Sequence, residues 1–192
     1  DHNPTYPGKL RDESNIGVLI NNVGVAFELD AFEFTQERYD SMFSTNFKAP
    51  ILLTKQLRSK LSNGLVINIS SVSDRLIGEK YALYCSSKAA LNKYFEVIAQ
   101  EEKQIKFISI LPSYVDTPLL RNLQSDKDFD WNATLKPLQV AEFVGELINT
   151  HDQIISGAKI IVVSNSLKED LEYKEDLWGY NADTHDLFKV KQ

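Results

Sequence analysis

Four short runs of apolar and β-branched residues constrain the fold of this chain most strongly. Within each run apolar residues occupy mostly successive positions instead of alternating with polar ones, and the runs cover residues 17–21, 64–69, 105–111 and 158–163. Such runs are typical of strands that are buried on both faces, as in a parallel sheet. We therefore expect four parallel strands, each followed by a longer segment that returns the chain to the start of the next strand.

Longer segments with helical spacing of apolar residues separate these runs. They cover residues 35–61, 84–102 and 138–149, and their apolar residues recur mostly three or four positions apart. Strands that alternate with helices of this length predict βα units joined by right-handed crossovers. The predicted fold class is α/β with an open parallel sheet.

The composition is that of a globular chain and argues against several classes of function. The 27 acidic residues outnumber the 21 basic residues, and the net charge is −6. An acidic chain without a basic cluster is not expected to bind nucleic acid or an anionic membrane surface. No apolar run approaches the roughly 20 residues of a membrane span, and the three dispersed histidines predict no metal site. No stretch has a secretory pattern, so we expect a cytoplasmic protein.

Residues 70–88 carry the side chains with the most evident chemistry. Tyr84 and Lys88 lie four positions apart, so on a helix they share one face with their Cβ atoms about 5–6 Å apart. An ammonium at that distance stabilises a phenolate and lowers the tyrosine pKa, which suits proton transfer near neutral pH. Ser70 and Ser71 follow a strand, where parallel sheets bind ligands. Alone, the pair is equally consistent with an ordinary contact on an amphipathic helix.

Four further motifs accompany this pair in a fixed order. They are NNVG at 21–24, TNF at 45–47, NISS at 68–71 and LPSYVDTP at 111–118, with YCSSK at 84–88 between the last two. In this order the motifs resemble the short-chain dehydrogenase/reductase family over about residues 16–163. The resemblance implies a Rossmann-like doubly wound parallel sheet in three layers, with the first strands of the fold absent from this chain.

The same resemblance divides the chain into a domain portion and a tail. Residues 1–164 are expected to form the carboxyl-terminal portion of one domain. Within it, residues 1–15 form an irregular lead-in and residues 119–136 a polar lid over the substrate. Residues 165–192 form an acidic tail that docks on the same chain or on a partner.

The resemblance implies a role for each residue that matches a family motif. Tyr84 matches the proton donor or acceptor, and Lys88 matches the residue that lowers the pKa of this tyrosine and binds the nicotinamide ribose. Ser71 matches the serine that orients the carbonyl, with Ser70 as the alternative. Asn46 matches the asparagine that holds a water in the proton relay.

The resemblance also implies contacts to the cofactor, which is NADP or NAD with NADP slightly preferred. Asn22 is expected near the adenosine side of the dinucleotide. Val115 and Thr117 match contacts to the nicotinamide carboxamide. Each residue also has a purely structural interpretation, since Asn22 can end a strand, Thr117 can cap a turn begun by Pro118, and Asn46 can bind backbone groups.

The implied function is hydride transfer between NAD(P)(H) and a carbonyl or secondary alcohol. The expected partners are that small-molecule substrate and further copies of the chain, in a homodimer or homotetramer formed through the two long helical segments. One alternative is a non-catalytic binding or regulatory member that has lost the dinucleotide site. Another is a nucleotide-sugar epimerase with the same YxxxK pair, which NNVG and Asn46 make less suitable.

One departure from the family pattern favours the non-catalytic alternative. Family members begin with a strand and a TGxxxGxG turn whose backbone holds the pyrophosphate, whereas no two of the eight glycines in this chain are close enough to form that turn. We expect the missing strands to precede Asp1, because residues 17–21 would otherwise expose a hydrophobic parallel edge. In smaller departures, Val23 replaces the commoner Ala and Ser113 replaces Gly.

Overall fold

A computed structural model describes residues 15–75, 78–164 and 178–189, and its centre is a single sheet. Six strands lie in the order β1-β2-β3-β4-β5-β6. Their bounds are Val18–Asn21 for β1, Leu65–Ile69 for β2, Lys106–Pro112 for β3, Ala158–Val163 for β4, Trp178–Asn181 for β5 and Asp186–Lys189 for β6. The first five strands are parallel and β6 is antiparallel to β5. The four predicted strands are therefore present.

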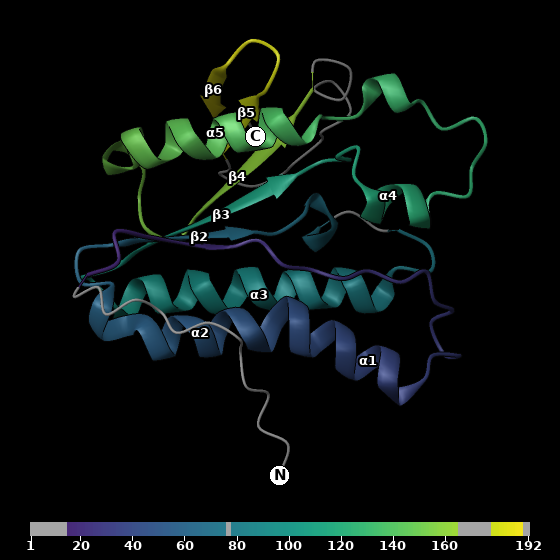
Figure 1. Cartoon of the computed structure of the whole chain (residues 1–192), viewed down its shortest axis with the longest axis horizontal. Coiled ribbons are helices and arrows are strands. Elements are labelled where there is room, and N and C mark those ends of the chain that lie inside the picture. Colours follow the sequence, from purple (N-terminus) through teal and green to yellow (C-terminus); the bar gives the residue numbers. More distant parts are fainter. Residues whose placement is uncertain (1–14, 76–77, 165–177, 190–192) are drawn as a thin grey trace.

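Helices cover both faces of the sheet. Figure 1 shows α2 and α3 on one face and α5 on the other. The helices are α1 (Gln36–Phe43), α2 (Ala49–Leu57), α3 (Ala82–Glu101), α4 (Pro118–Leu123) and α5 (Pro137–Thr150). Three layers with a parallel sheet at the centre confirm the predicted Rossmann-like doubly wound architecture. Across the described part of the chain, no helix is both long and apolar enough to cross a bilayer.

The continuous apolar runs in β2 and β3 supply two hydrophobic cores, one on each face. Successive side chains of a strand point to opposite faces. Ile67 and Ile110 pack toward Phe143 of α5, while Val66 packs on the other face with Phe95 of α3. All of these side chains are buried, which explains why the strands do not show the alternation of a half-exposed sheet.

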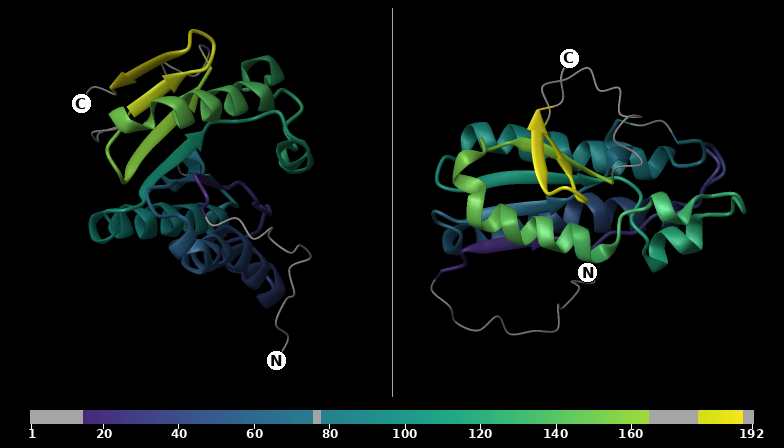
Figure 2. Two further views of the ribbon diagram at one scale, coloured as in Figure 1. Left: turned by 60° about the vertical axis from the view of Figure 1, so that its left-hand side comes forward. Right: turned by 90° about the horizontal axis from the view of Figure 1, so that it is seen from above.

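The three helical connections between β1 and β4 do not share one hand. The β1–β2 and β2–β3 connections cross on the face of α2 and α3, whereas the β3–β4 connection crosses on the opposite face through α5 (Figure 2). The strand order meanwhile continues in one direction. When the next strand is added on the same side but the connecting helix lies on the opposite face, the crossover has the opposite hand. The expectation of right-handed crossovers throughout is therefore wrong for this set.

The helical segment predicted over residues 35–61 is interrupted. It consists of α1, a π-helical turn at Ser44–Lys48, α2 and a 3-10 turn at Arg58–Lys60. The backbone N–H of Ala49 donates to the carbonyl of Ser44, five residues back, which is the π-helical pattern. The lid region contains the short helix α4 and a 3-10 turn at Trp131–Ala133.

Strands β5 and β6 lie in the segment that the sequence analysis treats as a tail. They form a hairpin at the far edge of the sheet (Figure 2). Tyr180 fastens this hairpin to α5: its ring stacks on Phe143 with 4.0 Å between centroids, and its hydroxyl donates to Glu146 at 2.9 Å. Residues 1–14, most of the predicted lead-in, and residues 165–177 and 190–192 of the tail lie outside the described residues.

Candidate active site

Four of the predicted site residues come together at the carboxyl edge of the sheet. Ser71 follows β2, Tyr84 and Lys88 lie in the first turns of α3, and Asn46 lies in the π-helical turn. Figure 1 shows the end of β2 and the start of α3 on the side where α4 lies. Open parallel sheets bind ligands at this edge, because the loops that follow their strands meet there.

Tyr84 and Lys88 share one face of α3, as their spacing predicts. The Nζ atom of Lys88 lies 5.8 Å from the centroid of the Tyr84 ring. Lys88 is only 4% exposed, and its ammonium donates to the carbonyl oxygen of Ile69 at the end of β2, at 3.1 Å. This bond holds the ammonium at the carboxyl end of β2.

Burial is the largest cause of the pKa shifts of Tyr84 and Lys88, ahead of any attraction between the two side chains. Burial lowers the pKa of Lys88 from 10.5 to about 8. Burial also raises the pKa of Tyr84, and a hydrogen bond with Ser71 partly offsets that rise. The spacing of Tyr84 and Lys88 predicts a lowered tyrosine pKa, but the pKa is raised because removing a phenolate from water outweighs the hydrogen bond. Tyr84 therefore stays protonated at neutral pH.

Ser71 holds its position through a local cap. Its backbone is extended, and its Oγ accepts from the N–H of Ser73 at 3.1 Å, which starts the 3-10 turn at Val72–Asp74. The hydroxyls of Ser71 and Ser73 lie 3.0 Å apart. Because Ser71 also bonds to Tyr84, the loop after β2 and the start of α3 present two hydroxyls side by side.

Asn46 joins the π-helical turn to the loop after β1. Its Nδ2 donates to the carbonyl of Val25 at 2.8 Å and its Oδ1 accepts from the N–H of Val25 at 2.8 Å. The same Nδ2 donates to Ser87 Oγ at 3.0 Å, and Ser87 donates to the carbonyl of Tyr84 at 2.8 Å. Asn46 thereby connects the loop after β1 to the turn of α3 that carries the tyrosine.

Gly24 keeps the space between these groups open. A Cβ atom at this position would lie 3.4 Å from Asn46 Oδ1 and 3.5 Å from Lys88 Nζ. A side chain larger than methyl would therefore fill the surroundings of the ammonium. The absence of a side chain leaves room for a ligand beside Lys88.

The structure places the other predicted cofactor residues, Asn22, Val115 and Thr117, in the loops that follow β1 and β3. Asn22 is exposed after β1. Val115 forms an isolated parallel bridge with Leu135. The hydroxyl of Thr117 accepts from the N–H of Leu120 at 3.3 Å and caps α4. The capping interpretation of Thr117 is thus realised.

Sequence reasoning missed a polar row beside the site. Asn21 Nδ2 donates to Asn68 Oδ1 at 2.8 Å between β1 and β2. Within the described ranges, Asn68 Nδ2, Ser70 Oγ and Ser113 Oγ are buried without a hydrogen-bond partner. Asn21 and Asn68 open the motifs NNVG and NISS, and their equivalent positions in adjacent strands were the available signal.

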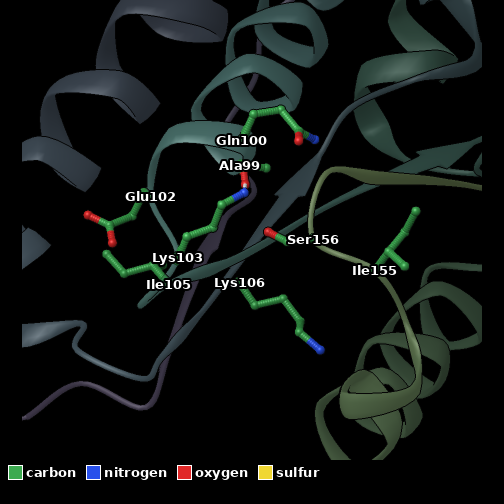
Figure 3. Close-up of a pocket in the computed structure, with 8 residues that line it drawn as sticks. All are labelled: Ala99, Gln100, Glu102, Lys103, Ile105, Lys106, Ile155 and Ser156. Carbon is green, nitrogen blue, oxygen red and sulfur yellow. Dashed lines mark hydrogen bonds between the residues drawn. The ribbon is translucent and has the colours of Figure 1, made fainter.

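A hollow of about 340 Å³ lies at the opposite, amino-terminal edge of the sheet (Figure 3). Its charged groups serve the backbone or other side chains: Lys106 donates to the carbonyl of His151, Lys103 to that of Ala99, and Glu102 pairs with Arg58. It is remote from the tyrosine–lysine pair. Among the described residues, no group of three His, Cys, Asp or Glu side chains is arranged to hold a metal ion.

Known proteins share both the sequence pattern and the fold. The short chain dehydrogenase family profile matches residues 9–128. L-xylulose reductase from Bos taurus is 32% identical over 117 residues, which cover 58% of this chain and 48% of that protein. An angucycline C-6 ketoreductase with bound NADP aligns with a TM-score of 0.67 at 25% identity, over 77% of this chain and 61% of its own.

A third relative extends the likeness in fold. The 3-ketoacyl-(acyl-carrier-protein) reductase from Brucella melitensis, complexed with NADH, aligns with a TM-score of 0.69 at 21% identity, over 77% of this chain and 65% of its own. The chain spans about half the length of the bovine relative. The family match covers the loop after β1, the π-helical turn, Ser71 and the tyrosine–lysine pair. The chain therefore belongs to the short-chain dehydrogenase family.

Proposed function

We propose that this protein is an NAD(P)-dependent oxidoreductase that transfers hydride between NAD(P)(H) and a carbonyl or secondary alcohol. The connected set of Ser71, Tyr84, Lys88 and Asn46 is the observation that carries the proposal. Support also comes from the relatives, which are named as reductases, and from structures described with NADP or NADH.

The residues present fit the nicotinamide end of such a cofactor. Lys88 has one hydrogen bond within the described chain, and an ammonium carries three donors, so two remain for ribose hydroxyls. Gly24 leaves space beside that ammonium, and Ser70 and Ser113 offer buried hydroxyls without partners among the described residues. Val115 and Thr117 would contact the carboxamide, and Asn22 the adenosine side. When bound, the nicotinamide supplies or accepts the hydride.

The side chains divide the remaining work. Tyr84 is protonated because burial raises its pKa, so it donates a proton to the carbonyl oxygen in the reducing direction. Ser71 hydrogen-bonds the same oxygen and stabilises the negative charge that develops there. Lys88 would bind the ribose, and a water held near Asn46 would supply the proton that Lys88 relays toward Tyr84.

Three finer statements belong to the same proposal. NADP is the slightly preferred cofactor, in line with the NADP-bound ketoreductase. The protein acts in the cytoplasm. It forms a homodimer or homotetramer through α2 and α3, where Leu52, Leu53 and Val97 are 50%, 39% and 49% exposed.

The test compares the wild-type protein with Tyr84→Phe. Each is mixed with NADPH or NADH and a panel of ketones and aldehydes, and the loss of nicotinamide absorbance is followed. Removing the phenolic proton is expected to lower kcat by roughly 100-fold or more, because positioned general acids contribute that much. Phe32→Ala is the control, since Phe32 is 93% exposed. Equal turnover by wild type and Tyr84→Phe would refute the mechanism.

A non-catalytic binding protein is the second candidate function. The observation in its favour is the lack of a glycine-rich turn among the eight glycines of the sequence. Calorimetry with NADPH and NADH separates the two candidates. Binding of either dinucleotide supports the oxidoreductase, and absence of binding together with absence of turnover supports the non-catalytic protein.

A further inference from the structure

Three aromatic rings form a continuous cluster above the carboxyl end of β3. The rings of Tyr114 and Phe129 meet edge to face with 5.4 Å between centroids, and those of Phe129 and Trp131 with 4.9 Å. The guanidinium of Arg121 lies 4.7 Å from the centroid of the Trp131 ring. Ring pairs in this geometry attract each other beyond their buried area. The rings of the lid therefore hold one another in a half-buried cluster.

Backbone and ionic contacts fix this cluster to the sheet. Asp116 receives two bonds from Arg121, at 2.6 and 2.9 Å, and one from Lys136 at 3.1 Å. The N–H of Leu135 donates to the carbonyl of Tyr114, and the N–H of Asp116 donates to the carbonyl of Leu135. The backbone around Tyr114 is thus held by bonds on both sides of this residue.

Tyr114 follows β3 at the same carboxyl edge of the sheet as the proton donor. Tyr81 is one turn before Tyr84 at the start of α3, and burial, Glu28 and Tyr114 together raise the pKa of Tyr81. Ile110 of β3 lies opposite Ile69 of β2, so Tyr114 and Ser71 each follow the end of one of two adjacent strands. Tyr114 is 50% exposed, so part of its ring is open to solvent.

The charges around this ring disfavour an anionic ligand. Both cations at the cluster, Arg121 and Lys136, are paired with Asp116. The neighbouring lid positions Asp126, Asp128 and Asp130 are exposed and acidic. A phosphate or carboxylate would meet repulsion from these carboxylates, whereas a neutral apolar group would not.

We propose that Tyr114 selects for a neutral, planar aromatic substituent on the carbonyl substrate, which stacks against the exposed part of its ring while Phe129 holds that ring in place. This inference rests on the proposed function, because it assigns the substrate class of the same site. Tyr114 acts here as a specificity-determining residue, and the chemistry stays with Tyr84.

The experiment compares two neutral ketones, phenyl methyl ketone and cyclohexyl methyl ketone, with saturating NADPH or NADH. The readout is the phenyl-to-cyclohexyl ratio of kcat/KM. Dividing a variant's ratio by that of wild type removes the intrinsic reactivity of each ketone. In Tyr114→Leu, which keeps apolar bulk, the ratio is expected to fall by about 2- to 12-fold, the range of an aromatic pair contact. Tyr114→Phe and the control Phe32→Leu are expected to keep it.

Failure of this inference is distinguishable from failure of the proposed function. Turnover with an unchanged ratio in Tyr114→Leu, or an equal fall in Phe32→Leu, overturns the inference and leaves the function standing. If no ketone is turned over, saturation-transfer NMR with phenyl methyl ketone and dinucleotide gives the second readout. Contact that Tyr114→Leu abolishes and Tyr114→Phe retains supports the inference, and no contact in wild type overturns it.

Discussion

Lys88 is buried, and burial disfavours the charged form of its side chain. Its folded-state pKa of about 8 lies below the ordinary value of 10.5, so between these two pH values the native state binds fewer protons than the unfolded state. Stability contributed by this group therefore rises with pH across that window. Below pH 8 the full cost of the buried ammonium is present, and the proposed ribose contact is the reason to keep it.

Replacing the charge is expected to stabilise the protein while removing function. The pKa shift corresponds to about 3 kcal/mol, and loss of the Lys88–Ile69 bond offsets about 2 kcal/mol of that by leaving a carbonyl unpaired. Lys88→Met should therefore gain about 1 kcal/mol in free energy of unfolding at pH 7. The difference should shrink and reverse as the pH approaches 10. Urea denaturation at several pH values measures it, and a pH-independent loss would contradict the argument.

Two glycines in or next to the secondary-structure elements differ in the space that surrounds them. Gly64 precedes β2, where a Cβ atom would lie 2.8 Å from the carbonyl oxygen of Leu61 and 2.9 Å from that of Ile16. Gly145 lies exposed within α5, and nothing lies within 4 Å of its Cβ position. The first glycine allows the entry to β2 to approach neighbouring backbone, while the second only weakens a helix.

The same substitution should consequently act in opposite directions at the two positions. Gly64→Ala is expected to lower the free energy of unfolding by about 2 kcal/mol, because backbone must move to relieve the overlap. Gly145→Ala should raise it by about 0.5–1 kcal/mol through helix propensity. Chemical denaturation of both variants provides the measurement. Equal effects would show that the close approach at Gly64 is not a constraint.

The elements differ in how far local sequence determines them. The continuous apolar runs predict β1 to β4, and in β2, β3 and β4 that pattern follows from burial on both faces. The break at Ser44–Lys48 is hidden, since it depends on Asn46 reaching Val25 across the fold. Strand β5 is hidden for a related reason: it has four residues, and Tyr180 is held by Phe143 and Glu146 of a distant helix.

The candidate site shows the same division. Spacing alone places Tyr84 and Lys88 on one face, and the motif order brings Ser71 and Asn46 to them. Spacing could not predict that the pKa of Tyr84 is raised, because the shift depends on how far the folded chain buries the phenol. The ring cluster depends likewise on packing between Tyr114 and Phe129, which lie fifteen positions apart.

At the scale of the whole molecule, the two edges of the sheet differ. The edge strand β1 pairs only with β2 among the described strands, and Ile20 is 43% exposed, whereas Ile67 beside it is fully buried. Unpaired strand edges with apolar side chains promote association between chains. The other edge ends in the β6 strand of a hairpin.

A charge on β1 should therefore reduce self-association of the isolated chain. Ile20→Lys is expected to lower concentration-dependent association in light scattering, with a change of less than about 0.5 kcal/mol in stability because the side chain is half exposed. Ile155→Lys is the matched control, since Ile155 is 74% exposed away from this edge. Similar association by wild type and Ile20→Lys would argue that β1 is not the contact surface.

The strand order β1-β2-β3-β4-β5-β6 repeats the order of synthesis. On a ribosome, each of these described strands therefore meets its partner as the most recently completed edge, and none of them has to insert between two others. Asn46, Ser71, Tyr84 and Lys88 all emerge before β3. The nascent chain thus contains the proton-transfer residues before the ring cluster of the lid and the hairpin that closes the sheet.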